Sequence, residues 1–270
     1  MVRNKNEWRR RMAEKDSLFA RFGFWKSRKH YLNKMTLREL IVAYFQYYAI
    51  QAYLAIGTVS LVVLAMNFPG VVPTLIVVGL SSLAYPLAWY LLHRYILHGQ
   101  FLYRMPLTAP VWKRIHYDHH QDPYDLEVLF GALYTTLPTV AIVTMPMGWL
   151  IGGIGGAFAG LATGVFVTCF YEFCHCIQHL AYKPKSEFLK RIKKWHMSHH
   201  FHNENGNFGI TNYVWDRAFG TFDPENTVLA KSPTVFNLGY TEEEAVKYPW
   251  VARVSGGLGP ATPRERRISD

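Results

Sequence analysis

Two long blocks of the chain carry no charged side chain. Residues 41–92 contain no Asp, Glu, Lys or Arg in 52 consecutive positions, and residues 128–171 contain none in 44. Turn-forming residues divide each block, at Asn-Phe-Pro-Gly in positions 67–70 and at a glycine-rich stretch in positions 152–156. Each half reaches about 20 apolar residues, which is the length of a helix that crosses the hydrocarbon core of a bilayer. The pattern predicts four transmembrane helices, at about 40–66, 71–92, 128–151 and 157–176.

These four helices would form two hairpins, with polar segments before, between and after them. We therefore expect an all-α membrane protein whose polar segments build a cytosolic helical cap. It would have three parts: a basic membrane-surface segment at 1–39, the membrane helices at 40–182 and a cytosolic C-terminal segment at 183–270. Two shallow hairpins that enter only one leaflet are the alternative arrangement.

The distribution of the 29 Lys and Arg residues predicts the orientation in the membrane. Twelve lie in residues 1–39, four lie between the second and third helices, thirteen follow the fourth, and neither hairpin turn contains one. Because cytoplasmic segments carry the excess of Lys and Arg, both termini are predicted to be cytoplasmic. The N-terminal segment combines its positive charge with Trp and Phe residues and is expected to lie on anionic lipid. Without a recognition motif, this charge does not indicate nucleic-acid binding.

Ten of the twelve histidines fall in four short boxes. The boxes read HxxxxH at 93–98, HxxHH at 116–120, HxxxH at 175–179 and HxxHH at 196–200. The predicted topology brings all four boxes to the cytoplasmic end of the helices. The candidate metal ligands are His93, His98, His116, His119, His120, His175, His179, His196, His199 and His200.

The spacing within each box has a geometric meaning. On a helix, positions i+3 and i+4 lie within about 60° of position i, so each HxxHH triplet is expected to point its imidazoles at one place. The same holds for His175 and His179. His93 and His98 lie about 140° apart on a regular helix, so they share a site only if the helix ends or unwinds near Gly99.

The number of imidazoles predicts two metal ions. A structural zinc has four ligands, and ten histidines suit two ions with about five ligands each, or four and a water. Imidazole binds Fe, Zn, Cu and Ni alike, so the ligands alone do not select the metal. Each half of the chain repeats the order hairpin, histidine pair, histidine triplet, which suggests two related halves around one site.

Acidic residues close to the boxes are candidates for orienting the imidazoles by accepting their distal N–H groups. Glu172 is the acid within the predicted helices, three residues before His175, and direct metal ligation is its alternative role. Asp118 and Asp216 are further candidates, for which capping or solvation is an equal explanation. His202 follows His200 by two residues, points elsewhere on a helix and is expected near the site or on the surface.

The boxes and their surroundings resemble the fatty acid hydroxylase superfamily of membrane di-iron enzymes. The resemblance covers residues 84–223 and has the four boxes in the same order. Residues 189–222, with Asn-Phe-Gly-Ile-Thr at 207–211, and residues 119–125 are most similar to the fatty acid and sphingolipid 2-hydroxylase branch. The resemblance implies two iron ions, which zinc can replace in a purified sample, and O2 as the oxidant.

The resemblance also implies hydroxylation of a lipid, such as a fatty acyl chain linked to ceramide. Electrons would come from a separate donor of the cytochrome b5 or ferredoxin type. The membrane would be the endoplasmic reticulum in a eukaryote or the inner membrane in a bacterium. The alternatives are a sterol or lipid desaturase or sterol methyl oxidase with the same site, and a membrane metal-binding or transport protein. Transport is disfavoured because every box lies at one membrane face.

Overall fold

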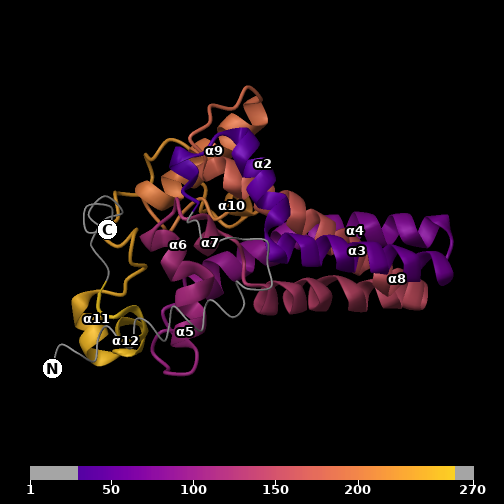
Figure 1. Ribbon diagram of the computed structural model, residues 1–270, viewed down its shortest axis with the longest axis horizontal. Helices are drawn as coiled ribbons and strands as arrows, with labels where there is room; N and C mark the ends of the chain where they lie inside the picture. Colours follow the sequence, from indigo (N-terminus) through magenta and orange to yellow (C-terminus); the bar gives the residue numbers. More distant parts are fainter. Residues whose placement is uncertain (1–29, 259–270) are drawn as a thin grey trace.

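The computed structural model describes residues 30–258, which fold into helices and connecting loops without a β-strand. Long antiparallel helices form a bundle that projects from a head of shorter helices (Figure 1). The longer elements are α2 (Leu37–Gln46), α3 (Tyr48–Met66), α4 (Val71–Leu91), α8 (Leu133–His179) and α9 (Glu187–Phe201). The predicted all-α membrane fold is confirmed. Most of the basic N-terminal segment, residues 1–29, lies outside the described residues.

Three apolar segments within the described residues are long enough to cross a membrane: Tyr48–Met66, Val71–Leu97 and Leu126–His179. The third is folded back on itself, because Gly152 and Gly153 have non-helical backbone angles and the φ of Gly153 is +58°. The two limbs of α8 then pack tightly. A Cβ on Gly148 would lie 2.2 Å from the carbonyl oxygen of Gly156. The bundle therefore has four apolar limbs in two hairpins, as the uncharged blocks indicated.

The two hairpin turns meet at the end of the bundle that is remote from the head. A Cβ on Gly155 would lie 1.9 Å from the carbonyl oxygen of Asn67, so only a glycine allows this approach. Large apolar side chains such as Ile142 and Leu150, 74% and 84% exposed, cover the outside of the bundle, where lipid would surround them. Because the turns share one end, the opposite ends of all four limbs reach the head.

The first predicted membrane helix, at 40–66, is broken at Tyr47, and that part of the prediction is wrong. A capping box between Thr36 and Glu39 starts α2, and Tyr47 then has extended backbone angles before α3 begins. The Tyr47 ring is buried and stacks on Phe130 with ring centroids 4.1 Å apart. Burial of this ring against Phe130, which directly follows the short helix α7 (Leu126–Leu129), outweighs the continuation of the helix, and apolar composition alone could not indicate this contact.

The head has its own apolar core, which joins the segment after α4 to the C-terminal helices α11 (Glu242–Lys247) and α12 (Trp250–Ser255). The Tyr103 hydroxyl donates to the Glu244 carboxylate at 3.0 Å across this junction. The core residues are Tyr103, Ala109, Trp112, Tyr117, Leu238, Tyr240, Ala245 and Val251. This packing fixes the short helical segments that carry the first two histidine boxes.

Candidate metal centre

The head end of the bundle brings the ten histidines of the four boxes together in two groups of five. Within each group, one ring nitrogen per residue lies within 4.8 Å of the corresponding atoms of the others. The first group is His93, His98, His116, His120 and His199. The second group is His119, His175, His179, His196 and His200. All four boxes therefore converge, and both groups could hold metal ions.

Each group takes one histidine from the other half of the chain. His119, the middle residue of the first triplet, lies in the second group, and His199, the middle residue of the second triplet, lies in the first group. The expectation that each triplet points at one place is therefore wrong for these two rings. Viewed along a helix, position i+3 is rotated about 60° to one side of position i, and position i+4 is rotated about 40° to the other side. The middle imidazole therefore turns toward the neighbouring group.

A widened helical turn places His93 and His98 in the same group. Residues Leu92–Leu97 form a π-helical segment, and the His98 N–H donates to the His93 carbonyl oxygen at 3.1 Å. Such an i to i+5 bond brings residues five apart onto one face, and π-helical turns often occur at functional sites. The sequence allowed a shared site only if the helix ends or unwinds near Gly99, and the helical segment does end at Leu97, with His98 as its C-cap. The widened turn between the two histidines was not predicted.

In both groups, Nε2 atoms of neighbouring imidazoles face one another. In the first group the Nε2 atoms of His116 and His98 are 2.9 Å apart, and in the second those of His179 and His196 are also 2.9 Å apart. Burial lowers the pKa of His120 to about 3, and burial together with neighbouring histidines lowers the pKa of His116 well below its ordinary value. Neutral imidazole is the form that binds metal.

Backbone carbonyls, rather than acidic side chains, orient three of these rings. The Nδ1–H groups of His93, His120 and His199 donate to the carbonyl oxygens of Phe208, Val235 and Gly206, at 2.6, 2.8 and 2.8 Å. Each bond fixes the tautomer that leaves the Nε2 lone pair facing the group. The sequence did not reveal these acceptors, because every residue has a carbonyl and only the path of the chain selects which one is used.

Four residues were predicted to lie near the metal ligands: Glu172, Asp118, His202 and Asp216. The structure gives each of them a different hydrogen-bond partner. The Glu172 carboxylate accepts the Gly131 N–H at 3.1 Å, and it has no hydrogen bond to a histidine within the described part of the chain. Asp118 forms an ion pair with Lys113 at 2.7 Å. The structure brings neither acid to a distal N–H of the two groups.

The side chains of His202 and Asp216 both bond to backbone groups. The His202 ring donates to the Leu229 carbonyl at 2.7 Å and lies outside both groups. Asp216 is fully buried and accepts the N–H groups of Phe208 and Gly209 at 2.7 and 2.9 Å. Since the Phe208 carbonyl accepts from His93, Asp216 holds the loop that orients a histidine.

The donor set fits borderline metal ions such as iron and zinc. The buried Nε2 atoms of His120, His199 and His200 have no hydrogen-bond partner among the described residues, although unsatisfied buried polar atoms are costly. An ion at the centre of each group would satisfy them. Imidazole suits Fe and Zn, whereas Ca²⁺ and Mg²⁺ require oxygen ligands.

Adding Fe²⁺ or Zn²⁺ to the metal-free protein is expected to raise its thermal unfolding temperature. An ion that binds only the folded state stabilises it by about 2.7 kcal/mol when its free concentration is 100 times the dissociation constant. Thermal unfolding in detergent micelles, followed by intrinsic fluorescence, measures the shift. Ca²⁺ is the control, since it prefers oxygen ligands. An equal shift with Ca²⁺, or no shift with any ion, would contradict a histidine metal site.

An apolar cavity of about 260 Å³ opens beside the histidines. Side chains such as Trp89, Leu92 and Leu129 form its apolar walls. Its polar end is lined by His93, His116, His119, His175 and Glu172. The cavity therefore joins an apolar space to residues of both histidine groups, and ligand pockets typically combine apolar walls with a few polar groups in this way.

Comparison with known proteins identifies a matching family and similar sequences. The family model described as "Fatty acid hydroxylase" matches residues 76–221. The ceramide very long chain fatty acid hydroxylase SCS7 of Saccharomyces cerevisiae is 30% identical over 149 residues, which are 53% of this chain and 36% of that protein. The dihydroceramide fatty acyl 2-hydroxylase FAH2 of Arabidopsis thaliana is 31% identical over 167 residues, 58% of this chain and 65% of that protein. The chain thus spans less than two thirds of either relative.

A solved structure shares the fold. The structure titled "Full length scs7p (only hydroxylase domain visible)" is similar with a TM-score of 0.59 and 24% sequence identity, over 70% of this chain and 69% of that one. The family match covers more than half of this chain and includes all four histidine boxes. This protein therefore belongs to the fatty acid hydroxylase family, whose members are enzymes that hydroxylate lipids.

Proposed function

We propose that this protein is a membrane-bound, O2-dependent hydroxylase of a lipid acyl chain, with two iron ions held by the ten histidines. The observation that carries this proposal is the cavity, whose apolar walls lead to His93, His116, His119 and His175. The names of the relatives support a fatty acyl chain, either as a fatty acid or within ceramide, as the substrate. Zinc could take the place of iron in purified protein, because both ions bind imidazole.

The two groups divide the ligands equally in this proposal. His93, His98, His116, His120 and His199 would hold one ion, and His119, His175, His179, His196 and His200 the other. Bound iron with O2 would supply the oxidising power for an unactivated C–H bond, which no amino-acid side chain has.

The residues of the chain would position the acyl chain and exclude water from it. The apolar wall, including Trp89 and Leu129, would hold the acyl chain extended toward the histidines by burying its methylene groups. Glu172 lies at the polar end of the cavity, where one oxygen accepts the Gly131 N–H and the other has no partner among the described residues. The free oxygen of Glu172 would bind a polar group of the lipid and so fix which carbon faces the metals.

The proposal also includes an electron donor and an orientation in the membrane. The reaction requires reducing equivalents, which we assign to a separate electron donor of the cytochrome b5 or ferredoxin type. The histidine groups and both termini would face the cytoplasm, because none of the Lys and Arg residues lies in a hairpin turn. That membrane would be the endoplasmic reticulum in a eukaryotic cell or the inner membrane in a bacterium.

The convergence of all ten histidines at one end of the bundle argues against ion transport, which needs ligands along a path through the bilayer.

Cells that express the protein under heavy-isotope O2 are expected to accumulate hydroxylated acyl lipids that carry one heavy oxygen atom. Mass spectrometry of extracted lipids measures this product, and it separates hydroxylation from desaturation, which removes two hydrogens without adding oxygen. The control is the same cell line without the protein. An unchanged lipid profile, or a product that has only lost hydrogen, would contradict hydroxylation.

A further inference from the structure

We propose that the two histidine groups are unequal metal sites: the first group, containing His93, His120 and His199, binds its ion first and more tightly than the second. This inference rests on the proposed metal-dependent function and adds an order of loading to it. The two groups offer the same number and type of ligand. The difference between them lies in how their rings are held by the rest of the chain.

The first group is oriented before metal arrives. Three of its five imidazoles donate Nδ1–H to backbone carbonyl oxygens, those of Phe208, Val235 and Gly206. A hydrogen bond of this kind fixes the ring, selects the tautomer that binds metal through Nε2 and raises the basicity of that nitrogen. Ion binding at this group therefore requires little rearrangement.

The second group lacks this support. The buried Nδ1 atoms of His119, His179, His196 and His200 have no hydrogen-bond partner among the described residues. When a neutral imidazole binds metal through Nε2, its Nδ1 carries a proton that needs an acceptor. A buried donor without an acceptor is unfavourable. Metal binding at the second group must carry this cost, which the first group avoids at three of its rings.

A single short loop supplies two of the three acceptors. Gly206 and Phe208 flank Asn207, which has a left-handed φ of +55° and so turns the two carbonyls toward different histidines. The buried Asp216 carboxylate accepts the N–H groups of Phe208 and Gly209 and the Thr221 hydroxyl. The carbonyl that orients His93 is therefore held by a buried carboxylate.

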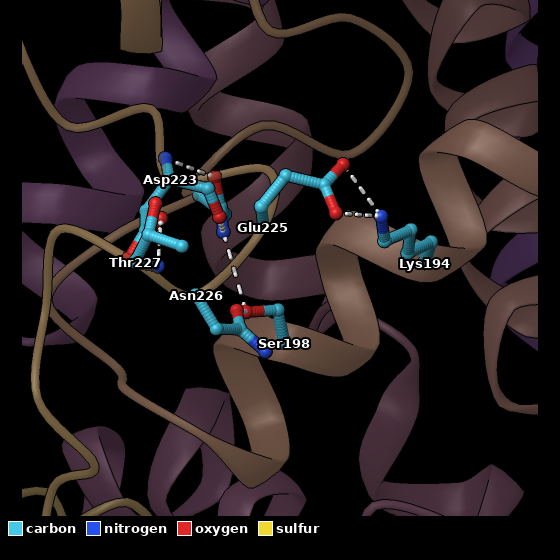
Figure 2. A network of polar contacts seen from close by, with 7 residues as sticks. Lys194, Ser198, Asp223, Glu225, Asn226 and Thr227 are labelled. Atoms are coloured by element: carbon cyan, nitrogen blue, oxygen red, sulfur yellow. Dashed lines mark hydrogen bonds and ion pairs between the residues drawn. The ribbon is translucent and has the colours of Figure 1, made fainter.

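A second set of bonds holds the same loop from the side of α9. The Asn207 side chain donates to the Asp223 carbonyl at 2.8 Å and accepts the Asp223 N–H at 2.9 Å. The turn after Asp223 is bound to the outer side of α9 through Ser198 and Asn226, while Glu225 pairs with Lys194 (Figure 2). Since α9 also carries His199, the loop and this ligand are held as one unit.

Cobalt(II) titration of the metal-free full chain in detergent micelles tests the order of loading. Orienting partners of metal ligands are typically worth 10–100-fold in affinity. We therefore expect two absorbance steps, the second with a dissociation constant at least roughly tenfold larger than the first. His98→Ala removes a ligand of the first group and should abolish the tight step. His179→Ala removes a ligand of the second group and should abolish the weak step while leaving the tight one.

Asp216→Asn tests the loop without removing a ligand. It should weaken the tight step by about 10–100-fold and leave the weak step unchanged, because among the described residues the 206–209 loop accepts hydrogen bonds from two ligands of the first group and from none of the second. Glu187→Gln is the matched control, since this exposed carboxylate pairs with Lys190 at the start of α9 and contacts neither histidine group. It should leave both steps unchanged. If Asp216→Asn does not fold, the two histidine variants decide the order on their own.

The outcomes separate this inference from the proposed function. Two steps of equal affinity, or loss of the tight step in His179→Ala rather than His98→Ala, would overturn the unequal loading while the hydroxylase proposal stands. Two ordered steps, assigned as above, would support it even if no lipid product were found. Binding of no cobalt at all would overturn both.

Discussion

Replacing either His119 or His199 by alanine is expected to abolish lipid oxidation while the protein still inserts into the membrane. Each residue lies in a different group of five, so each variant should lose one of the two metal ions and retain the other. Loss of a ligand from a two-metal oxidation site should lower the rate by roughly a hundredfold or more. Product analysis by mass spectrometry, together with metal analysis of purified protein, measures both effects.

The exchange of the middle histidines makes this prediction specific. His199→Ala should empty the first group, although His199 belongs to the second half of the chain, and His119→Ala should empty the second group. His202→Gln is the matched control on the same helix end, because its ring contacts the Leu229 carbonyl and lies outside both groups. It should retain two metals and most of the activity. Near-normal turnover in either alanine variant would argue against the site.

Filling the cavity with Thr139→Trp is expected to block turnover of long acyl chains without loss of metal. Thr139 lines the cavity on the first limb of α8, and its hydroxyl is already satisfied by the Thr135 carbonyl at 2.9 Å. A Trp side chain occupies a large share of a cavity of about 260 Å³ and would displace the acyl chain from the histidines. Misplacement of about 1 Å can lower a rate about 100-fold. Product yield per bound metal measures the effect.

The matched control for this variant lies on the outside of the bundle. Thr58 on α3 is exposed, and its hydroxyl donates in the same way to the carbonyl four residues earlier, that of Leu54. Thr58→Trp adds the same side chain where lipid would surround the helix, so its activity should stay close to that of the unmodified protein. Equal activity of the two variants would show that the acyl chain does not use this cavity.

The membrane fold could be predicted from the sequence because its cause is local composition. Uncharged segments of sufficient length, divided by turns at 67–70 and 152–156, define the hairpins before any packing is known. The start of the first membrane helix could not be predicted in this way. It depends on the stacking of Tyr47 on Phe130, two residues that are remote in the chain and meet only in the folded protein.

The histidine boxes were also visible in the sequence, because their spacing and their place after apolar segments bring ten imidazoles to one end of the bundle. Their division into two groups was not. Helical periodicity indicates that His119 and His199 lie beside their neighbours in the boxes, and it does not indicate which group each ring enters. The widened turn between His93 and His98 is a further case, since regular helix geometry separates these rings.

The sequence by itself determined that this is a helical membrane protein with a cluster of ten histidines near one surface, since apolar length and residue spacing are properties of short segments. Only the tertiary structure decided which five imidazoles share a site, which carbonyls orient them and where a cavity meets them. These features depend on contacts between positions such as His93 and Phe208, which are far apart in the chain. Every residue has a backbone carbonyl, so no pattern of side chains could have predicted which carbonyls orient the imidazoles.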